Sequence, residues 1–119
     1  MGNDIKKYKN LTGLLLGPIR KRPGMYLGEP KISLLSNFIF GYQMGFYMAK
    51  NNDGAMDEYF GETGFLEWFF KKYNIRQTSF WRTPFLDEAD QDEKKALELF
   101  FKYLEEYSKE MNTKQAGSN

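Results

Sequence analysis

The side chains of this 119-residue chain that could do chemistry are mainly carboxylates, and their densest run lies between residues 87 and 93. The run has no Lys or Arg inside it and consists of Asp87, Glu88, Asp90, Asp92 and Glu93. Paired carboxylates hydrolyse glycosides when they converge across a cleft, but nothing in this spacing predicts one. The chain has no His and no Cys, so the commonest general base, nucleophile systems and metal ligands are missing. We therefore predict that the protein is not an enzyme and holds no metal and no cofactor.

The acidic run has two possible uses. Carboxylates at the start of a helix interact favourably with its N-terminal N–H groups and its dipole. Exposed carboxylates can instead steer a positively charged partner and select it. The sequence leaves both uses open, and Asp87, Glu88, Asp90 and Asp92 are candidate partner-binding residues.

An aromatic segment before the acidic run supplies two further candidates. Trp81 and Arg82 are of the types that dominate the energetics of protein interfaces. They are flanked by Phe80 and Phe85, which we expect to be buried in the core. For Trp81 and Arg82, burial in the core and contact with a partner are both possible.

The basic run Arg20-Lys21-Arg22 provides an alternative function. Cationic side chains bind phosphate, and Tyr26 nearby could stack on a base. A nucleotide- or nucleic-acid-binding module is therefore the alternative to protein binding. The nearly neutral chain, with a net charge of +1, argues against nucleic acid as a partner.

Residues 19–28, Ile-Arg-Lys-Arg-Pro-Gly-Met-Tyr-Leu-Gly, resemble the start of the ATPase domain of DNA gyrase B and its relatives. In that family the next helix carries a catalytic Glu and a magnesium-binding Asn. Here the stretch from Leu34 to Tyr42 has no carboxylate, and Asn37 lacks the expected Glu-x-x-x-Asn setting. The later Gly-rich nucleotide lid is also missing, so we predict no ATP site.

Hydrophobic residues recur at helical spacing along most of the chain, which predicts an all-α fold. We expect a small bundle with three longer helices and a short N-terminal helix, at about residues 34–51, 64–73, 91–111 and 11–21. The helix over 34–51 is apolar on much of its circumference, so we place it centrally. Residues 1–119 are predicted to form a single domain, with 1–10 and 112–119 disordered.

Local residue types predict where these helices begin and end. Because Pro cannot continue a helix, we expect Gly17-Pro18 to interrupt the first helix and Pro23 to end it. Residues 22–28 and 75–89 are expected to be irregular. The expected caps are Ser33 at the start of the second helix, Asn74 at the end of the third, and Asp90 or Asp92 at the start of the last.

Several motifs follow one another in a fixed order along the chain: residues 22–28, 33–35 with Phe38 and 41–42, 65–68 with 72–74, Trp81 and 92–107. This order resembles that of small bacterial immunity proteins from polymorphic-toxin and contact-dependent growth inhibition systems. It implies a stoichiometric inhibitor that binds one cognate toxin domain, often a nuclease, and blocks its active site or substrate groove. Such an inhibitor usually presents acids to a site built for phosphate. The expected contacts are Asp87, Glu88, Asp90, Asp92, Trp81 and Arg82.

Charge is distributed unevenly along the chain. Residues 1–50 carry eight Lys/Arg and two Asp/Glu, a net +6, whereas residues 51–119 carry nine and fourteen, a net −5. Such asymmetry can steer a charged partner. No apolar leader follows Met1, and no apolar run is long enough to cross a bilayer, so we expect a cytoplasmic protein with no membrane contact.

Overall fold

The longest helix, α8 (Glu93–Gly117), is the element against which most other helices pack. The computed structural model describes residues 11–49, 64–76 and 80–117, and within these ranges it contains helices and no strand. The predicted all-α fold is therefore confirmed. The other helices are α2 (Leu11–Leu14), η1 (Leu15–Ile19), α3 (Pro23–Leu27), α4 (Ile32–Ala49), α6 (Phe65–Lys72) and α7 (Thr83–Glu88).

Helix α8 begins where the sequence predicts but ends later. Asp92 caps it, because its Oδ1 atom accepts hydrogen bonds from the backbone N–H groups of Lys94 and Lys95, both at 3.0 Å. The apolar residues Leu97 and Phe100 recur at helical spacing and are buried. The helix continues to Gly117 instead of ending near residue 111, so residues 112–117 of the predicted tail are helical.

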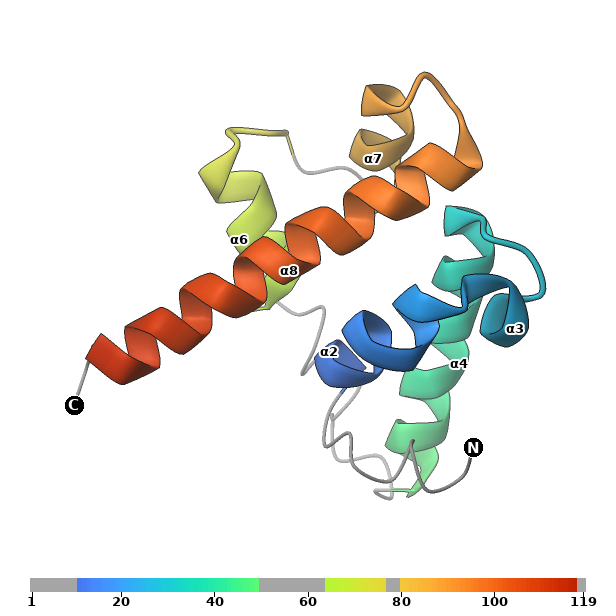
Figure 1. Ribbon diagram of the computed structural model, residues 1–119, viewed down its shortest axis with the longest axis horizontal. Helices are drawn as coiled ribbons and strands as arrows, with labels where there is room; N and C mark the ends of the chain where they lie inside the picture. The colour runs from blue at the N-terminus through green and yellow to red at the C-terminus, as the bar shows by residue number, and fades with distance from the viewer. Residues whose placement is uncertain (1–10, 50–63, 77–79, 118–119) are drawn as a thin grey trace.

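The two sides of α8 are covered by different parts of the chain. Helices α6 and α7 lie on one side of it, whereas η1 and α4 lie on the other (Figure 1). Aromatic rings fill the space between α6, α7 and α8. The ring of Phe69 stacks on that of Phe85 with 4.7 Å between centroids, and Phe100 meets Phe85 edge-on at 5.6 Å. Both Phe85 and Phe100 are fully buried.

The start of α4 is capped by a residue from another helix. The predicted cap, Ser33, is wrong, because α4 begins at Ile32 and Ser33 lies inside its first turn. The Ser33 backbone N–H donates to Oε1 of Glu93 at 2.9 Å. Glu93 is the first residue of α8, so its carboxylate lies near the positive ends of both helices. This contact ties the start of α4 to the start of α8.

The N-terminal helix passes through Gly17-Pro18 rather than breaking there. Pro18 has no N–H, and its ring would clash with the carbonyl group four residues earlier in an α-helix. The chain widens into the π-helical turn η1, which removes that conflict without ending the helix. The predicted irregular stretch 22–28 also contains the short helix α3, with Pro23 as its first residue.

Helices α6 and α7 end in the same way. Asn74 (φ 52°) ends α6 as predicted, and the Ile75 N–H donates to the Phe70 carbonyl at 2.9 Å. Helix α7 lies in the stretch 75–89 that was predicted to be irregular. With 6 residues it is too short to give a recognisable helical pattern in the sequence. Asp90 (φ 53°) follows its last turn, and the Gln91 N–H donates to the carbonyl of Leu86 at 2.7 Å. Asp90 therefore ends α7 and does not begin α8.

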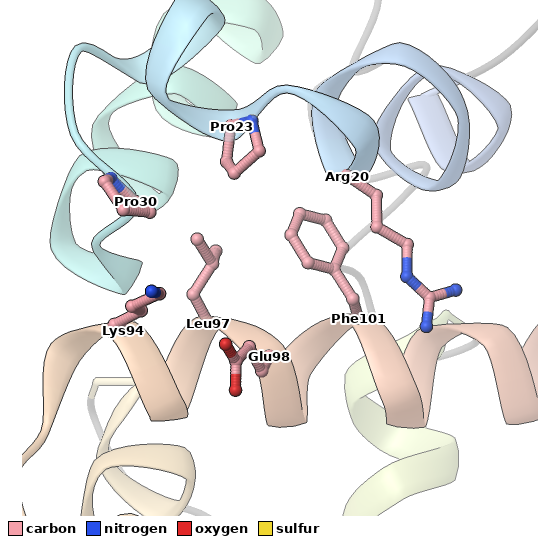
Figure 2. Close-up of a pocket in the computed structure, with 7 residues that line it drawn as sticks. All are labelled: Arg20, Pro23, Pro30, Lys94, Leu97, Glu98 and Phe101. Carbon is pink, nitrogen blue, oxygen red and sulfur yellow. The ribbon is translucent and has the colours of Figure 1, made fainter.

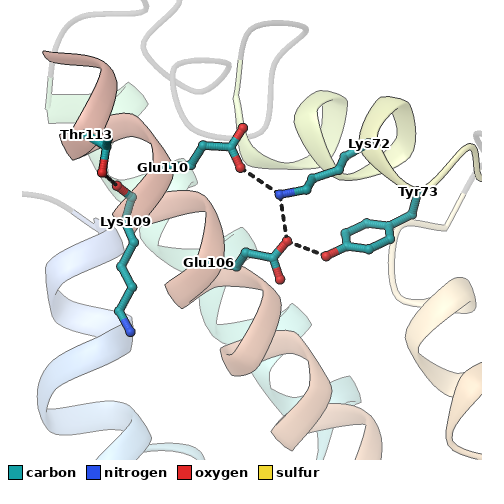
Figure 3. A network of polar contacts seen from close by, with 6 residues as sticks. All are labelled: Lys72, Tyr73, Glu106, Lys109, Glu110 and Thr113. Atoms are coloured by element: carbon teal, nitrogen blue, oxygen red, sulfur yellow. Dashed lines mark hydrogen bonds and ion pairs between the residues drawn. The ribbon is translucent and has the colours of Figure 1, made fainter. Parts of the chain in front are cut away.

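A polar network joins the end of α6 to the second half of α8 (Figure 3). The Lys72 ammonium group lies between two carboxylates, 2.9 Å from Glu106 Oε1 and 2.7 Å from Glu110 Oε2. The hydroxyl of Tyr73 donates to the same Glu106 oxygen. Hydrogen bonds from Tyr73 and Lys72 lower the pKa of Glu106, so this carboxylate is ionised at neutral pH.

Replacing Glu93 by Gln is expected to lower the free energy of unfolding by about 1 kcal/mol, because a charged acceptor shared by two helix starts is lost. Replacing Ser33 by Ala should cost less than about half as much, since Ser33 is not the cap. Urea unfolding followed by circular dichroism measures both. A larger loss for Ser33→Ala than for Glu93→Gln would contradict the assignment.

Candidate functional site

The acidic run lies at the corner between α7 and α8, and the structure divides it. Asp87 and Glu88 occupy the last turn of α7 and are exposed. Asp90 occupies the left-handed position that ends α7. Asp92 is committed to the N–H groups of α8, and these hydrogen bonds lower the pKa of its carboxyl group. Of the two uses predicted for the run, helix capping therefore accounts for Asp92.

Asp87 and Glu88 share a shallow pocket of about 370 Å³, which we call the α7 pocket. It lies between the ends of α6 and α7 and the middle of α8. No Lys or Arg is among the described residues that line it, so its carboxylates have no cationic partner in this part of the lining. The pocket is lined by Tyr73, Ile75, Pro84, Asp87, Glu88 and Tyr103.

Hydrogen bonds hold the two carboxylates of the α7 pocket. The Tyr103 hydroxyl donates to both carboxylate oxygens of Glu88, at 3.0 and 3.1 Å. The side-chain amide of Gln91 donates to Asp87 Oδ1 at 3.0 Å. Each carboxylate has four lone-pair positions, so both retain acceptor capacity for a second donor.

The two phenol groups of the pocket are neutral at physiological pH. Burial, followed by the hydrogen bond to Glu88, raises the pKa of Tyr103 to about 12. The hydrogen bond to Glu106 raises the pKa of Tyr73. The two rings lie 5.1 Å apart, centroid to centroid, and edge-on to each other. The α7 pocket thus combines negative charge with aromatic faces, an arrangement that favours a cation.

Trp81 and Arg82 lie at the other end of α7. Trp81 is partly buried, and its ring lies 5.3 Å from that of Phe100. The Arg82 guanidinium lies over the ring of Phe80 at 5.3 Å, and its Nη1 is 3.5 Å from Ser36 Oγ on α4. Of the six predicted contact residues, only Asp87 and Glu88 line the α7 pocket, so the structure does not gather the six in one site.

The predicted burial of the flanking phenylalanines is half right. Phe85 is completely buried, as expected. Phe80 is 61% exposed, so the prediction of a core position for it is wrong. Phe80 precedes α7, and its ring lies against the Arg82 guanidinium instead of entering the core.

Sequence reasoning missed an exposed apolar row on α4. Phe40, Met44 and Met48 are 62%, 39% and 65% exposed. We predicted that this helix is central because it is apolar around much of its circumference, and that prediction is wrong for its outer side. The row could have been recognised from its spacing of four residues on a helix that lacks charge from 32 to 49.

The basic run of the alternative function lies where η1 leads into α3. All its residues are exposed, and Arg20 Nη1 forms an ion pair with Glu105 Oε2 at 2.8 Å. Beside it is a pocket of about 230 Å³, where Leu97 and Phe101 point from α8 toward two prolines (Figure 2). Both charge signs occur on its rim, so this pocket has no clear preference for phosphate. Its lining residues are Arg20, Pro23, Pro30, Lys94, Leu97, Glu98 and Phe101.

Neither a metal centre nor a membrane span emerges from the part of the chain that the structure describes. Its acidic residues form no group of three or more that could hold a metal ion. Among its helices, none has the length and apolar character needed to traverse a bilayer. The sequence matches no protein-family model, and comparisons with curated proteins and with solved structures gave no match.

Replacing Asp92 by Ala is expected to destabilise the protein at neutral pH and to matter less in acid. The folded-state pKa of Asp92 is lowered, so its contribution is present above the unfolded-state pKa and is lost as pH falls through the folded-state value. Thermal unfolding of both proteins between neutral pH and about pH 2 measures the difference. Asp87→Ala is the control, because the Asp87 carboxylate accepts its hydrogen bond from the Gln91 side chain and not from a backbone N–H group at a helix start. A difference that does not change with pH would refute the capping role.

Proposed function

We propose that this chain is an immunity protein that binds and neutralises a cognate toxin domain, a nuclease, by occupying its active site or substrate groove. The observation that carries the proposal is the α7 pocket, in which Asp87 and Glu88 face solvent beside the rings of Tyr73 and Tyr103. The order of motifs that resembles bacterial immunity proteins supports the same function. Binding, and not catalysis, is its mechanism.

The chemistry of the α7 pocket complements that of a nuclease. A surface that binds the nucleic-acid backbone is rich in Lys and Arg, because it must neutralise phosphate. Carboxylates form short, strong hydrogen bonds with such groups, and aromatic faces attract them. Glu88 and Asp87 are already oriented by Tyr103 and Gln91, so less conformational entropy is lost on binding.

The neighbouring surface extends this contact. Asp90 lies two residues beyond Glu88 and adds a third exposed carboxylate at the corner between α7 and α8. At the other end of α7, Trp81 and Arg82 offer the large side chains that commonly anchor protein interfaces. A partner bound along α7 would contact both the carboxylates at the end of α7 and the pair Trp81 and Arg82 at its start. The carboxylates would then lie against the basic site of the partner and block it.

The proposal is tested by recovering the partner from the native cell. The tagged full-length chain is expected to retain one protein in a one-to-one complex, and a domain of that protein should stop growth when expressed alone in a laboratory bacterium. Co-expression with this chain should restore growth. Recovery of nucleic acid that washes off in salt, without a protein partner, would refute the proposal and favour binding through Arg20-Lys21-Arg22.

With the partner in hand, the double variant Asp87→Asn/Asp90→Asn is expected to associate about tenfold more slowly at low ionic strength, with a smaller effect in high salt. Asn keeps the size of each side chain and tolerates the left-handed backbone at position 90. Stopped-flow or surface-binding kinetics measure the rate.

The matched control is Glu29→Gln/Glu98→Gln, which removes the same number of negative charges from exposed positions away from α7. It should associate nearly as fast as the unaltered chain. Equal slowing in both double variants, or no slowing in either, would mean that the α7 pocket does not contact the partner.

A further inference from the structure

Helix α4 has two apolar faces, and only one of them is packed against the residues that the structure describes. The inner face, which includes Leu35 and Ile39, is buried. The outer face carries Phe40, Met44 and Met48, which we call the α4 outer stripe. Residues four apart lie above one another on a helix, so these side chains form one continuous row. Helix α4 starts beside α8 and runs away from it along the edge of the molecule (Figure 1).

Two glycines lie beside the α4 outer stripe. Gly41 and Gly45 are exposed, and a Cβ atom added to either would meet no atom of the described residues within 4 Å. Glycine inside a helix is less favourable than alanine, and no contact in the described part of the chain requires it here. The close approach of another backbone would make use of the missing side chains.

We propose that the α4 outer stripe is the contact between two copies of this chain, packed antiparallel across a twofold axis that passes near Met44. In that arrangement Met44 meets Met44 of the second copy, and Phe40 meets Met48 of the second copy. A twofold interface requires such reciprocal pairs. The Phe–Met pair is favourable in itself, because thioether sulfur packs well against aromatic rings.

The charge pattern favours a second copy as the occupant. Residues 32–49 contain no Asp, Glu, Lys or Arg, so pairing this helix with itself brings no like charges together. A surface that faces its own copy across a twofold axis must lack charged side chains near that axis, since each charge there would face an identical one. The acidic corner between α7 and α8 fails it, and so does the basic run at residues 20–22.

The exposed area of the α4 outer stripe limits how tightly two copies can bind through it. From their exposed fractions, the three side chains of the stripe present roughly 300 Å² per copy. Two copies together therefore bury roughly 600 Å² through the stripe, which is below the about 1,000 Å² of a stable specific interface and in the range of weak contacts. We therefore expect a weak dimer, with a dissociation constant on the order of micromolar.

The dimer is independent of the proposed function. The α7 pocket is built by α6, α7 and α8, and α4 lies on the other side of α8 (Figure 1). A dimer through α4 would leave the α7 pocket accessible. Failure of either proposal consequently leaves the other standing.

Sedimentation velocity of the full-length chain tests the self-association directly. The sedimentation coefficient is expected to rise from that of a monomer to that of a dimer across the micromolar range. Met44→Glu places two carboxylates face to face on the axis and should weaken the dimer at least about tenfold. Its circular dichroism spectrum and melting temperature establish that the variant is folded. A chain that stays monomeric at all concentrations, or a folded Met44→Glu variant that dimerises equally well, would overturn the proposal.

Disulfide trapping tests the geometry, because the chain has no native Cys. In oxidised glutathione, Met44→Cys should form a covalent dimer faster than Met25→Cys, a control on α3 whose native side chain is 49% exposed. Phe40→Cys and Met48→Cys should cross-link with each other faster than either does with itself. Cross-linking of Met44→Cys no faster than the control, or a preference for 40–40 and 48–48 pairs, would overturn the antiparallel arrangement.

Discussion

The burial of Phe100 against rings from three directions is the interaction on which the rest of the structure depends. Its ring meets Phe65 of α6 at 5.5 Å, Phe85 of α7 at 5.6 Å and Trp81 at 5.3 Å. Helices as short as α6, with 8 residues, and α7, with 6, are not stable alone in water. Packing against α8 supplies the stability that the backbone hydrogen bonds of such short helices do not provide. Since the α7 pocket is formed by the ends of α6 and α7, its shape depends on this aromatic core.

Carboxylates at the corner of α7 and α8 combine structural and exposed positions within a few residues. Asp92 accepts hydrogen bonds from two N–H groups at the start of α8, and Glu93 accepts one from the Ser33 N–H at the start of α4. Asp87, Glu88 and Asp90 remain at the surface, in positions fixed by the end of α7. The structural carboxylates thus hold the backbone that presents the exposed ones, and the candidate site is preorganised.

The molecule offers two surfaces of opposite character. The α7 pocket is acidic and aromatic, which suits a basic partner. The α4 outer stripe is apolar and uncharged, which suits a copy of itself. Helix α4 lies on the other side of α8 from α6 and α7 (Figure 1).

Local rules let the sequence by itself determine the all-α fold, the apolar face of α8, the end of α6 at Asn74 and a cap of α8 at Asp90 or Asp92, and the structure selects Asp92. Each depends on residues within about four positions of one another, which is the range of helical hydrogen bonds. The tertiary structure alone decided that Glu93, and not Ser33, caps α4, that α7 forms, and that Asp87 and Glu88 meet Tyr73 and Tyr103. It also decided which apolar face of α4 is buried, because both faces are hydrophobic and only one can pack on α8. These features depend on contacts between residues far apart in the chain, and neither propensity nor periodicity encodes such contacts.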